Sequence, residues 1–211
     1  MKALKWLVMI SFLMGMFGCS HIQEYIDIAR GDAASGEYFN ALNRYTREKT
    51  LYSEFETRIR VVATWKSRAF TDAYLAEYAR LYHLTEADRE ERRDILSGAS
   101  PDLREFLFYA YIPDRDSNDF SKADSLWKVF SLGEGGDKIE PVEIRELKVD
   151  PLVTKLFPYV KPYGKYYSVK FPMPLRADQG GPVLVFTGVL GKVELNWGDG
   201  TDRPRVSSNG S

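Results

Sequence analysis

Apolar and polar residues alternate over residues 54–65, where Ile59, Val61 and Trp65 are separated by charged or small neighbours. A period of two predicts a long strand with one side facing solvent. After Pro101, short runs rich in aromatic and β-branched residues are bounded by Pro, Gly, Asp or Asn, which is typical of further strands. These runs cover residues 106–112, 126–132, 138–147, 165–171, 183–189 and 192–197.

Other segments have the helical period. Apolar positions recur three and four residues apart over residues 22–29, from about 37 to 49 and over 68–82, which predicts amphipathic helices. Thr85 and Asp88 have the spacing of a capping box, so we expect a highly charged helix to about residue 96. Pro151 suits the first turn of a short helix that ends before Pro158.

These elements predict an α+β chain whose main part is a seven-stranded antiparallel β-sandwich of the immunoglobulin-like type. An N-terminal helical segment over residues 19–50 is expected to precede a sandwich domain over residues 51–197. The helices at about 68–97 form an insertion between the first two predicted strands. A polar tail over residues 198–211 is expected to be flexible.

The first 19 residues have a different character. Lys2 and Lys5 precede a mostly apolar run over residues 6–17, which is shorter than the roughly 20 residues that a membrane span needs. The run ends in Met16-Phe17-Gly18-Cys19, and this stretch resembles the lipobox of bacterial lipoproteins. Met16 stands where leucine is usual, and Phe17 is bulkier than the usual small residue.

The resemblance implies that residues 1–18 are a signal peptide and that Cys19 becomes the lipidated N-terminus, which attaches the protein to a membrane without spanning it. An ordinary signal peptide or a signal anchor is the alternative. Ser20 after Cys19 is compatible, within this family, with the bacterial outer membrane and a periplasm-facing domain. Inner-membrane anchoring or secretion stays open.

Composition narrows the possible functions. The formal net charge is −1, and acidic and basic residues are mixed throughout, so no basic field for nucleic acid is present. Cys19 is the only cysteine, which excludes an internal disulfide. The fold must therefore be stabilised by packing of its apolar side chains, since 44% of the residues are hydrophobic and 14% are aromatic.

The candidate metal ligands lie in one predicted loop: Asp114, Asp116, Asn118 and Asp119. Oxygen ligands at alternate positions can converge on calcium, as in the first half of an EF-hand loop. Position six is Asp119 where glycine is required, and position twelve is Ser125 where a bidentate glutamate is required. A calcium site would need ligands from another loop. The alternative is a connection in which these side chains cap turns, with no cofactor.

The densest aromatic stretch, residues 156–171, interleaves tyrosines with lysines. Tyr167, Val169 and Phe171 fit the buried face of a strand. Tyr159 and Tyr163, flanked by prolines, are the candidate contacts for a protein partner.

The sequence offers few candidate catalytic residues, because His21 and His83 are the only histidines and no nucleophile has an evident base. We expect a lipid-anchored cell-envelope protein with a non-catalytic binding or scaffolding role and an envelope protein as its partner. The alternative is an envelope hydrolase or carbohydrate-active enzyme with its site on the loops over residues 114–124.

Overall fold

The structure is a computed structural model, and it describes residues 34–97, 102–133, 135–173 and 181–198. The chain divides into two units, Met1–Ala33 and Ala34–Ser211, and all described residues belong to the second. The predicted signal peptide, the lipobox with Cys19 and most of the predicted tail lie outside the described residues.

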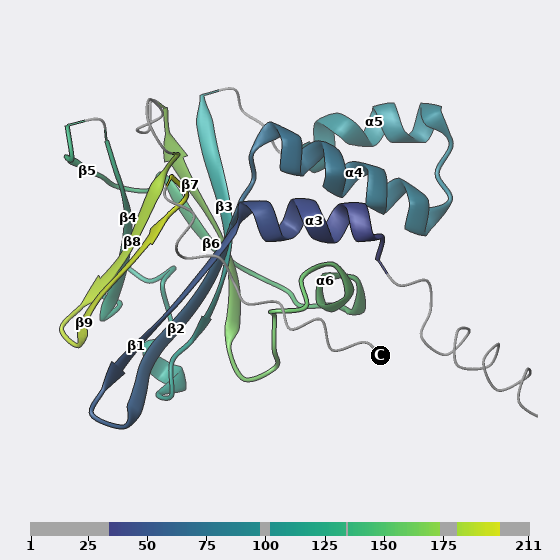
Figure 1. Ribbon diagram of the computed structural model, residues 1–211. Coiled ribbons are helices and arrows are strands. Elements are labelled where there is room, and N and C mark those ends of the chain that lie inside the picture. Colours follow the sequence, from purple (N-terminus) through teal and green to yellow (C-terminus); the bar gives the residue numbers. More distant parts are fainter. Residues whose placement is uncertain (1–33, 98–101, 134, 174–180, 199–211) are drawn as a thin grey trace, which may run out of the picture. The chain divides into compact units, whose positions relative to one another are not determined.

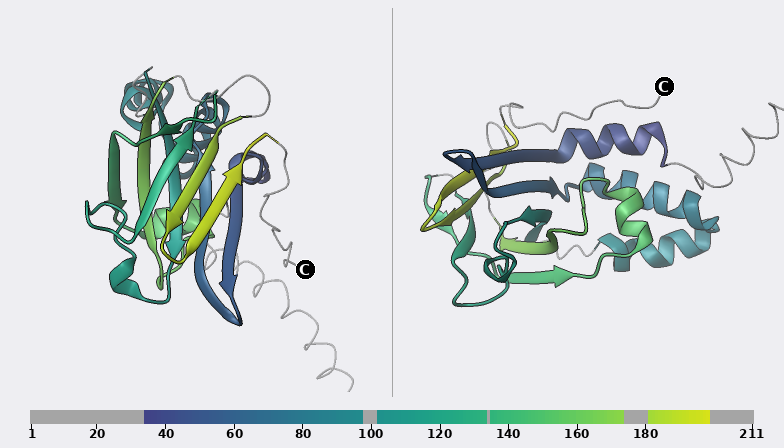
Figure 2. Two further views of the ribbon diagram at one scale, coloured as in Figure 1. Left: turned by 90° about the vertical axis from the view of Figure 1, so that its left-hand side faces the viewer. Right: turned by 90° about the horizontal axis from the view of Figure 1, so that it is seen from below.

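The described residues form two antiparallel sheets (Figures 1 and 2). The strands of the five-stranded sheet are, in spatial order, β1 (Thr46–Ser53), β2 (Glu56–Trp65), β3 (Leu103–Tyr111), β7 (Lys165–Pro172) and β6 (Glu143–Leu147). The four-stranded sheet has the order β5 (Lys138–Ile139), β4 (Trp127–Leu132), β8 (Val183–Gly188) and β9 (Gly191–Asn196).

Side chains from the two sheets meet in one hydrophobic core. Phe108 of β3 stacks on Tyr167 of β7 with ring centroids 4.9 Å apart, and Phe186 of β8 meets Phe108 edge-on at 5.1 Å. Trp127 at the start of β4 is 1% exposed and belongs to the same cluster. Aromatic pairs of this geometry add to the stabilisation that burial already gives.

Four helices are described: α3 (Gly36–Tyr45), α4 (Arg68–Tyr82), α5 (Glu86–Ser97) and α6 (Pro151–Leu156). Each begins where a side chain can bond a free backbone N–H. Ser35 accepts from Tyr38, Ser67 from Phe70 and Asp150 from Val153, and Thr85 and Asp88 form the predicted capping box. A short 3-10 helix, η1 (Arg115–Ser117), lies between β3 and β4.

Helices cover the other face of the five-stranded sheet and form a second core there. Tyr38 and Leu42 of α3 belong to this core, as do Phe70 of α4 and the strand residues Tyr109 and Tyr166. The central strands are therefore buried on both faces. Strands in that position carry nearly continuous apolar runs, and residues 106–111 of β3 are such a run, whereas β7 also carries Ser168 and Lys170.

The α+β class and the antiparallel sheets are confirmed, and the helices α4 and α5 form an insertion between two strands, β2 and β3. The expected number of seven strands is wrong for the described residues, which form nine. The predicted helix to residue 49 ends at Tyr45, and β1 follows at once, so a strand crosses the expected boundary at residue 51.

Besides β1, one more strand was not expected, because a single predicted strand is divided in two. The predicted strand over residues 138–147 is two strands, β5 and β6, which belong to different sheets. Pro141 lies between them. Proline cannot donate a backbone hydrogen bond, so the ladder of β5 ends there and the chain crosses to the other sheet.

Candidate functional site

Three loops lie at the same end of the two sheets: the β1–β2 turn, the β3–β4 connection over residues 112–126 and the β8–β9 turn (Figures 1 and 2, lower left in Figure 1). A hollow of about 580 Å³ lies between the start of β2, the β3–β4 connection and the β8–β9 turn. Its lining comes from the start of β2, the end of β3 and both connections, and it includes Arg58, Tyr111, Pro113, Leu126, Val189 and Leu190. We call these three loops with their hollow the loop end.

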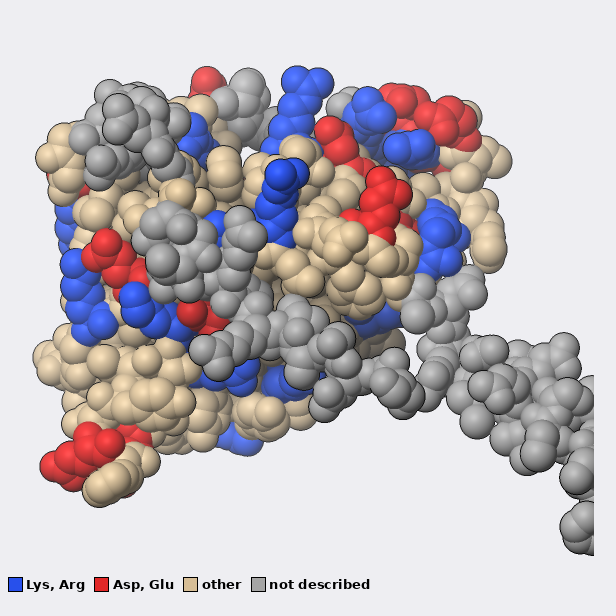
Figure 3. Space-filling model, in the orientation of Figure 1, with Lys and Arg blue, Asp and Glu red and all other residues tan. Residues whose placement is uncertain are grey.

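Large apolar side chains are exposed at the loop end. Phe55 is 103% exposed and Val189 83%, while Tyr52, Leu126 and Leu190 are between 48% and 64% exposed. Single exposed apolar residues are common on proteins, but several in one region mark a surface that contacts something other than water. On the face drawn in Figure 3, the lower left is mostly uncharged, with acidic groups at the tip.

Close packing brings the β8–β9 turn against strand β1. Gly191 closes the β8–β9 turn with φ +137°, and a Cβ built there would lie 2.7 Å from Cδ2 of Leu51 in β1. A side chain at this position would push the turn away from β1 and would be strained in that backbone conformation. Val189 and Leu190 are therefore presented by a turn that is fixed against the neighbouring sheet.

The four candidate metal ligands are used mainly within the β3–β4 connection. Asp114 caps η1, accepting from the Asp116 backbone at 3.2 Å and from the Ser117 hydroxyl at 2.5 Å. The Asn118 amide donates to the Ala110 carbonyl at 2.8 Å. Oδ2 of Asp119 lies 3.5 Å from Nζ of Lys122. These bonds are those of a capped turn.

No group of three or more histidine, cysteine, aspartate or glutamate side chains that could hold a metal ion gathers among the described residues. Oδ1 of Asp119 is buried without a hydrogen-bond partner in that part of the chain, so it can accept from a water or an ion. Only Asp114 of the four lines the hollow. Calcium binding therefore stays a prediction, because the described residues provide no set of ligands that converge on one point.

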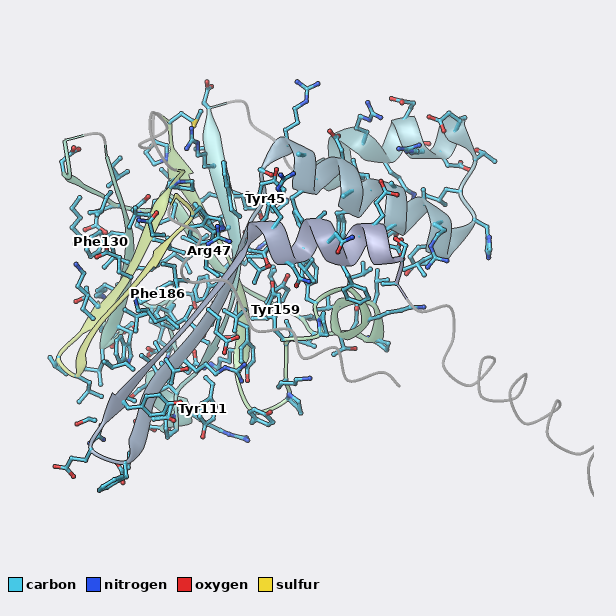
Figure 4. The ribbon with its side chains drawn as sticks, viewed as in Figure 1. Tyr45, Arg47, Tyr111, Phe130, Tyr159 and Phe186 are labelled. Atoms are coloured by element: carbon cyan, nitrogen blue, oxygen red, sulfur yellow. The ribbon has the colours of Figure 1, made fainter. Side chains whose placement is uncertain are left out.

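The two candidate tyrosines have different environments. Tyr163 is 49% exposed, and its ring meets Tyr111 edge-on at 5.7 Å, next to the hollow. Tyr159 packs with the second core, and its hydroxyl lies 2.8 Å from Oγ1 of Thr64. Burial raises the pKa of Tyr159. Figure 4 shows Tyr111 low in the molecule and Tyr159 near the helices. Because Tyr163 is exposed and Tyr159 packs with the second core, Tyr163 is the more accessible of the two candidate contacts.

Sequence reasoning missed four surface residues. It assigned Phe55, Leu126 and Val189 to strands and left Leu190 between two strands without a role. One signal was available. Val189 and Leu190 form a Gly-Val-Leu-Gly stretch between two strand patterns, where a two-residue turn usually carries polar residues or glycine. Two branched apolar residues in such a turn depart from that pattern.

Comparisons of the chain with models of protein families, with curated proteins and with solved structures give no match. No helix in the described part of the chain is long and apolar enough to cross a membrane. The chemistry of the loop end must therefore be judged from its own residues.

Two carboxylates, Glu56 and Asp114, line the hollow. Glu56 lies 3.2 Å from Arg58, and both oxygens of Asp114 accept the hydrogen bonds that cap η1. A general acid or base must be able to reach the proton that it transfers. The arrangement is therefore better suited to apolar contact than to proton transfer.

Proposed function

We propose that the chain is a lipid-anchored cell-envelope protein that binds a protein partner through its loop end and has no catalytic role. The observation that carries this proposal is the set of exposed apolar side chains at one end of the two sheets, of which Leu126, Val189 and Leu190 line one hollow. Removing such side chains from water stabilises a complex by roughly 25 cal/mol per Å² of apolar area. Aromatic and aliphatic residues with few free charges are typical of the centre of a protein interface.

We further infer that the two sheets form an immunoglobulin-like β-sandwich extended by one edge strand, β1. The strand order supports this. If β2 takes the place of strand A, the five-stranded sheet contains A-B-E-D and the four-stranded sheet contains C′-C-F-G. Trp127 takes the place of the buried tryptophan of strand C.

The same correspondence supports the proposed partner surface. The β3–β4 connection and the β8–β9 turn would be the B–C and F–G loops, which bind antigen in variable domains. This is an analogy at the level of the fold, so the functional argument rests on the exposed residues themselves.

Attachment to the membrane rests on the resemblance of Met16-Phe17-Gly18-Cys19 to a lipobox. Labelling cells with radioactive palmitate tests it. We expect label on the protein and none on Cys19→Ala, with Ser20→Ala as the control. Fractionation of the labelled membranes then separates the outer from the inner membrane.

Site-specific cross-linking tests the partner surface. A photoreactive p-benzoyl-phenylalanine at position 189 should give a discrete cross-linked protein in membranes. The control is the same group at position 142, since Val142 is also apolar and 58% exposed but precedes β6, far along β7 from the loop end. Equal products from both positions, or none from position 189, would contradict the proposal.

The enzyme alternative has one observation in its favour, namely that Glu56 and Asp114 line the same hollow. It requires one of them to leave its present partner when substrate binds. If the protein hydrolyses cell-wall glycan and Asp114→Asn or Glu56→Gln abolishes that hydrolysis, the enzyme replaces the binding module as the better account.

A further inference from the structure

A second hollow, of about 270 Å³, lies on the helix-covered face of the five-stranded sheet. Residues of α4, α6, β3, β7 and β6 line it, and it shares none with the hollow at the loop end. Its volume is slightly below the roughly 300–1,000 Å³ of sites for drug-sized molecules. A ligand there would be small.

Aromatic rings form one side of this hollow. Phe157, after α6, stacks with Tyr74 of α4 at a centroid distance of 6.0 Å and an interplanar angle of 25°. Phe70, one turn earlier in α4, lies 6.4 Å from Phe157. Ring faces and edges of this kind favour a flat apolar group.

Charged side chains form the other side, and cations are in excess. Glu105, Lys170 and Glu143 lie side by side on β3, β7 and β6. Lys66 pairs with Glu105 at 2.6 Å, and Lys170 pairs with Glu143 at 2.8 Å. The negative charges of Glu105 and Glu143 thus balance the positive charges of Lys66 and Lys170.

Arg145 is the additional cation of this cluster. Its Nε lies 3.9 Å from Oε1 of Glu143, whose other oxygen accepts from Lys170, and its side chain is 63% exposed. A guanidinium presents a planar fork of donors that matches a carboxylate. Charge complementarity in this hollow therefore favours an anion.

Tyr166 also lines the hollow and is 2% exposed. Its hydroxyl interacts with the hydroxyl of Tyr159, which is itself bonded to Thr64. Burial raises the pKa of Tyr166 well above its ordinary value, so this side chain stays uncharged. Arg145 therefore supplies the charge that an anion in the hollow would meet.

We propose that this hollow binds a small aromatic carboxylate. Its ring packs against Phe157 and Tyr74, and its carboxylate accepts from Arg145. This site is separate from the partner surface, and its existence does not depend on the function proposed above.

Equilibrium dialysis of labelled 2-naphthoate against the full chain in lipid nanodiscs tests the proposal, with empty nanodiscs as the blank. We expect saturable binding of one 2-naphthoate per chain and at least tenfold weaker binding of the neutral 2-naphthamide. Arg145→Gln, at an exposed position, should weaken 2-naphthoate binding at least tenfold. Arg93→Gln, in the exposed part of α5, should leave it unchanged.

Heat denaturation without ligand separates ligand binding from folding. Arg145→Gln should unfold at the same temperature as Arg93→Gln, because both side chains are exposed. Uptake equal to that of empty nanodiscs, equal binding of the amide, or unchanged binding by Arg145→Gln would overturn the proposal.

Discussion

A buried arginine joins the two sheets. Arg47 of β1 is 2% exposed, and its Nε and Nη2 donate to the carbonyls of Asn196 and Trp197 at 2.9 and 3.2 Å. Its Nη1 donates to the Arg44 and Thr46 carbonyls. Trp197 also donates a hydrogen bond to the segment before β1, from its indole N–H to the Tyr45 carbonyl at 2.7 Å. Side-chain bonds to carbonyls thus tie β1 to the end of β9 (Figure 4).

Arg47→Met should lower the free energy of unfolding by about 3 kcal/mol, because it leaves buried carbonyls without donors. Arg47→Lys should cost less but remain destabilising, since an ammonium cannot reproduce the planar fork. Urea denaturation measures both. Arg93→Met on exposed α5 is the matched control, and an Arg47→Met variant as stable as that control would refute the role given to Arg47.

At the scale of elements, a glutamate connects two helices. Glu77 of α4 is 3% exposed and accepts from the Ser35 backbone at the start of α3 at 3.0 Å and from Arg80 at 2.8 Å. Burial alone would raise the pKa of Glu77, but these hydrogen bonds and the charge of Arg80 hold that pKa below its ordinary value of 4.5.

A lowered folded-state pKa gives stability that is complete above the unfolded value of about 4.5 and is lost as the pH falls through the folded pKa. Glu77→Gln should cost about 2 kcal/mol at pH 7. The difference from the unaltered protein should shrink below about pH 5. Denaturation at several pH values measures it, with Glu37→Gln on the exposed side of α3 as control. A difference that stays constant with pH would contradict this linkage.

Strand β1 shows why the sequence predicted some elements and missed others. The helix caps and the apolar periods of β2, β3 and β7 are local signals, and the corresponding elements were found within a few residues. The inward positions of β1 are Arg47, Lys49 and Leu51. The first two side chains reach backbone carbonyls of β9, and only Leu51 packs against the core. Such a strand has no apolar period, so only the assembled sheets reveal it.

At the scale of the whole molecule, the loop end could not be predicted because its parts are distant in sequence. Phe55, Leu126 and Val189 lie in three different connections, and antiparallel pairing brings those connections to one end. The sequence did single out the β3–β4 connection, but for its aspartates, which the fold uses mainly as turn caps. Its apolar neighbour Leu126 faces the hollow.

The exposed residues of the loop end can be substituted without loss of the fold. The two cores lie between the sheets and under the helices, while Val189 and Leu190 are exposed. Polar substitutions there should change the free energy of unfolding by no more than about 0.5 kcal/mol. Partner binding and stability can therefore be measured separately.

The most direct test replaces Val189→Ser and Leu190→Ser together and measures, by quantitative mass spectrometry, how much of the cross-linked partner co-purifies from membranes. We expect at least a tenfold loss with unchanged stability, and no loss for the control pair Val142→Ser and Met173→Ser, which are also exposed but lie at the opposite end of β7. Undiminished co-purification with the loop variant, or an equal loss with the control pair, would contradict the claim that this end binds the partner.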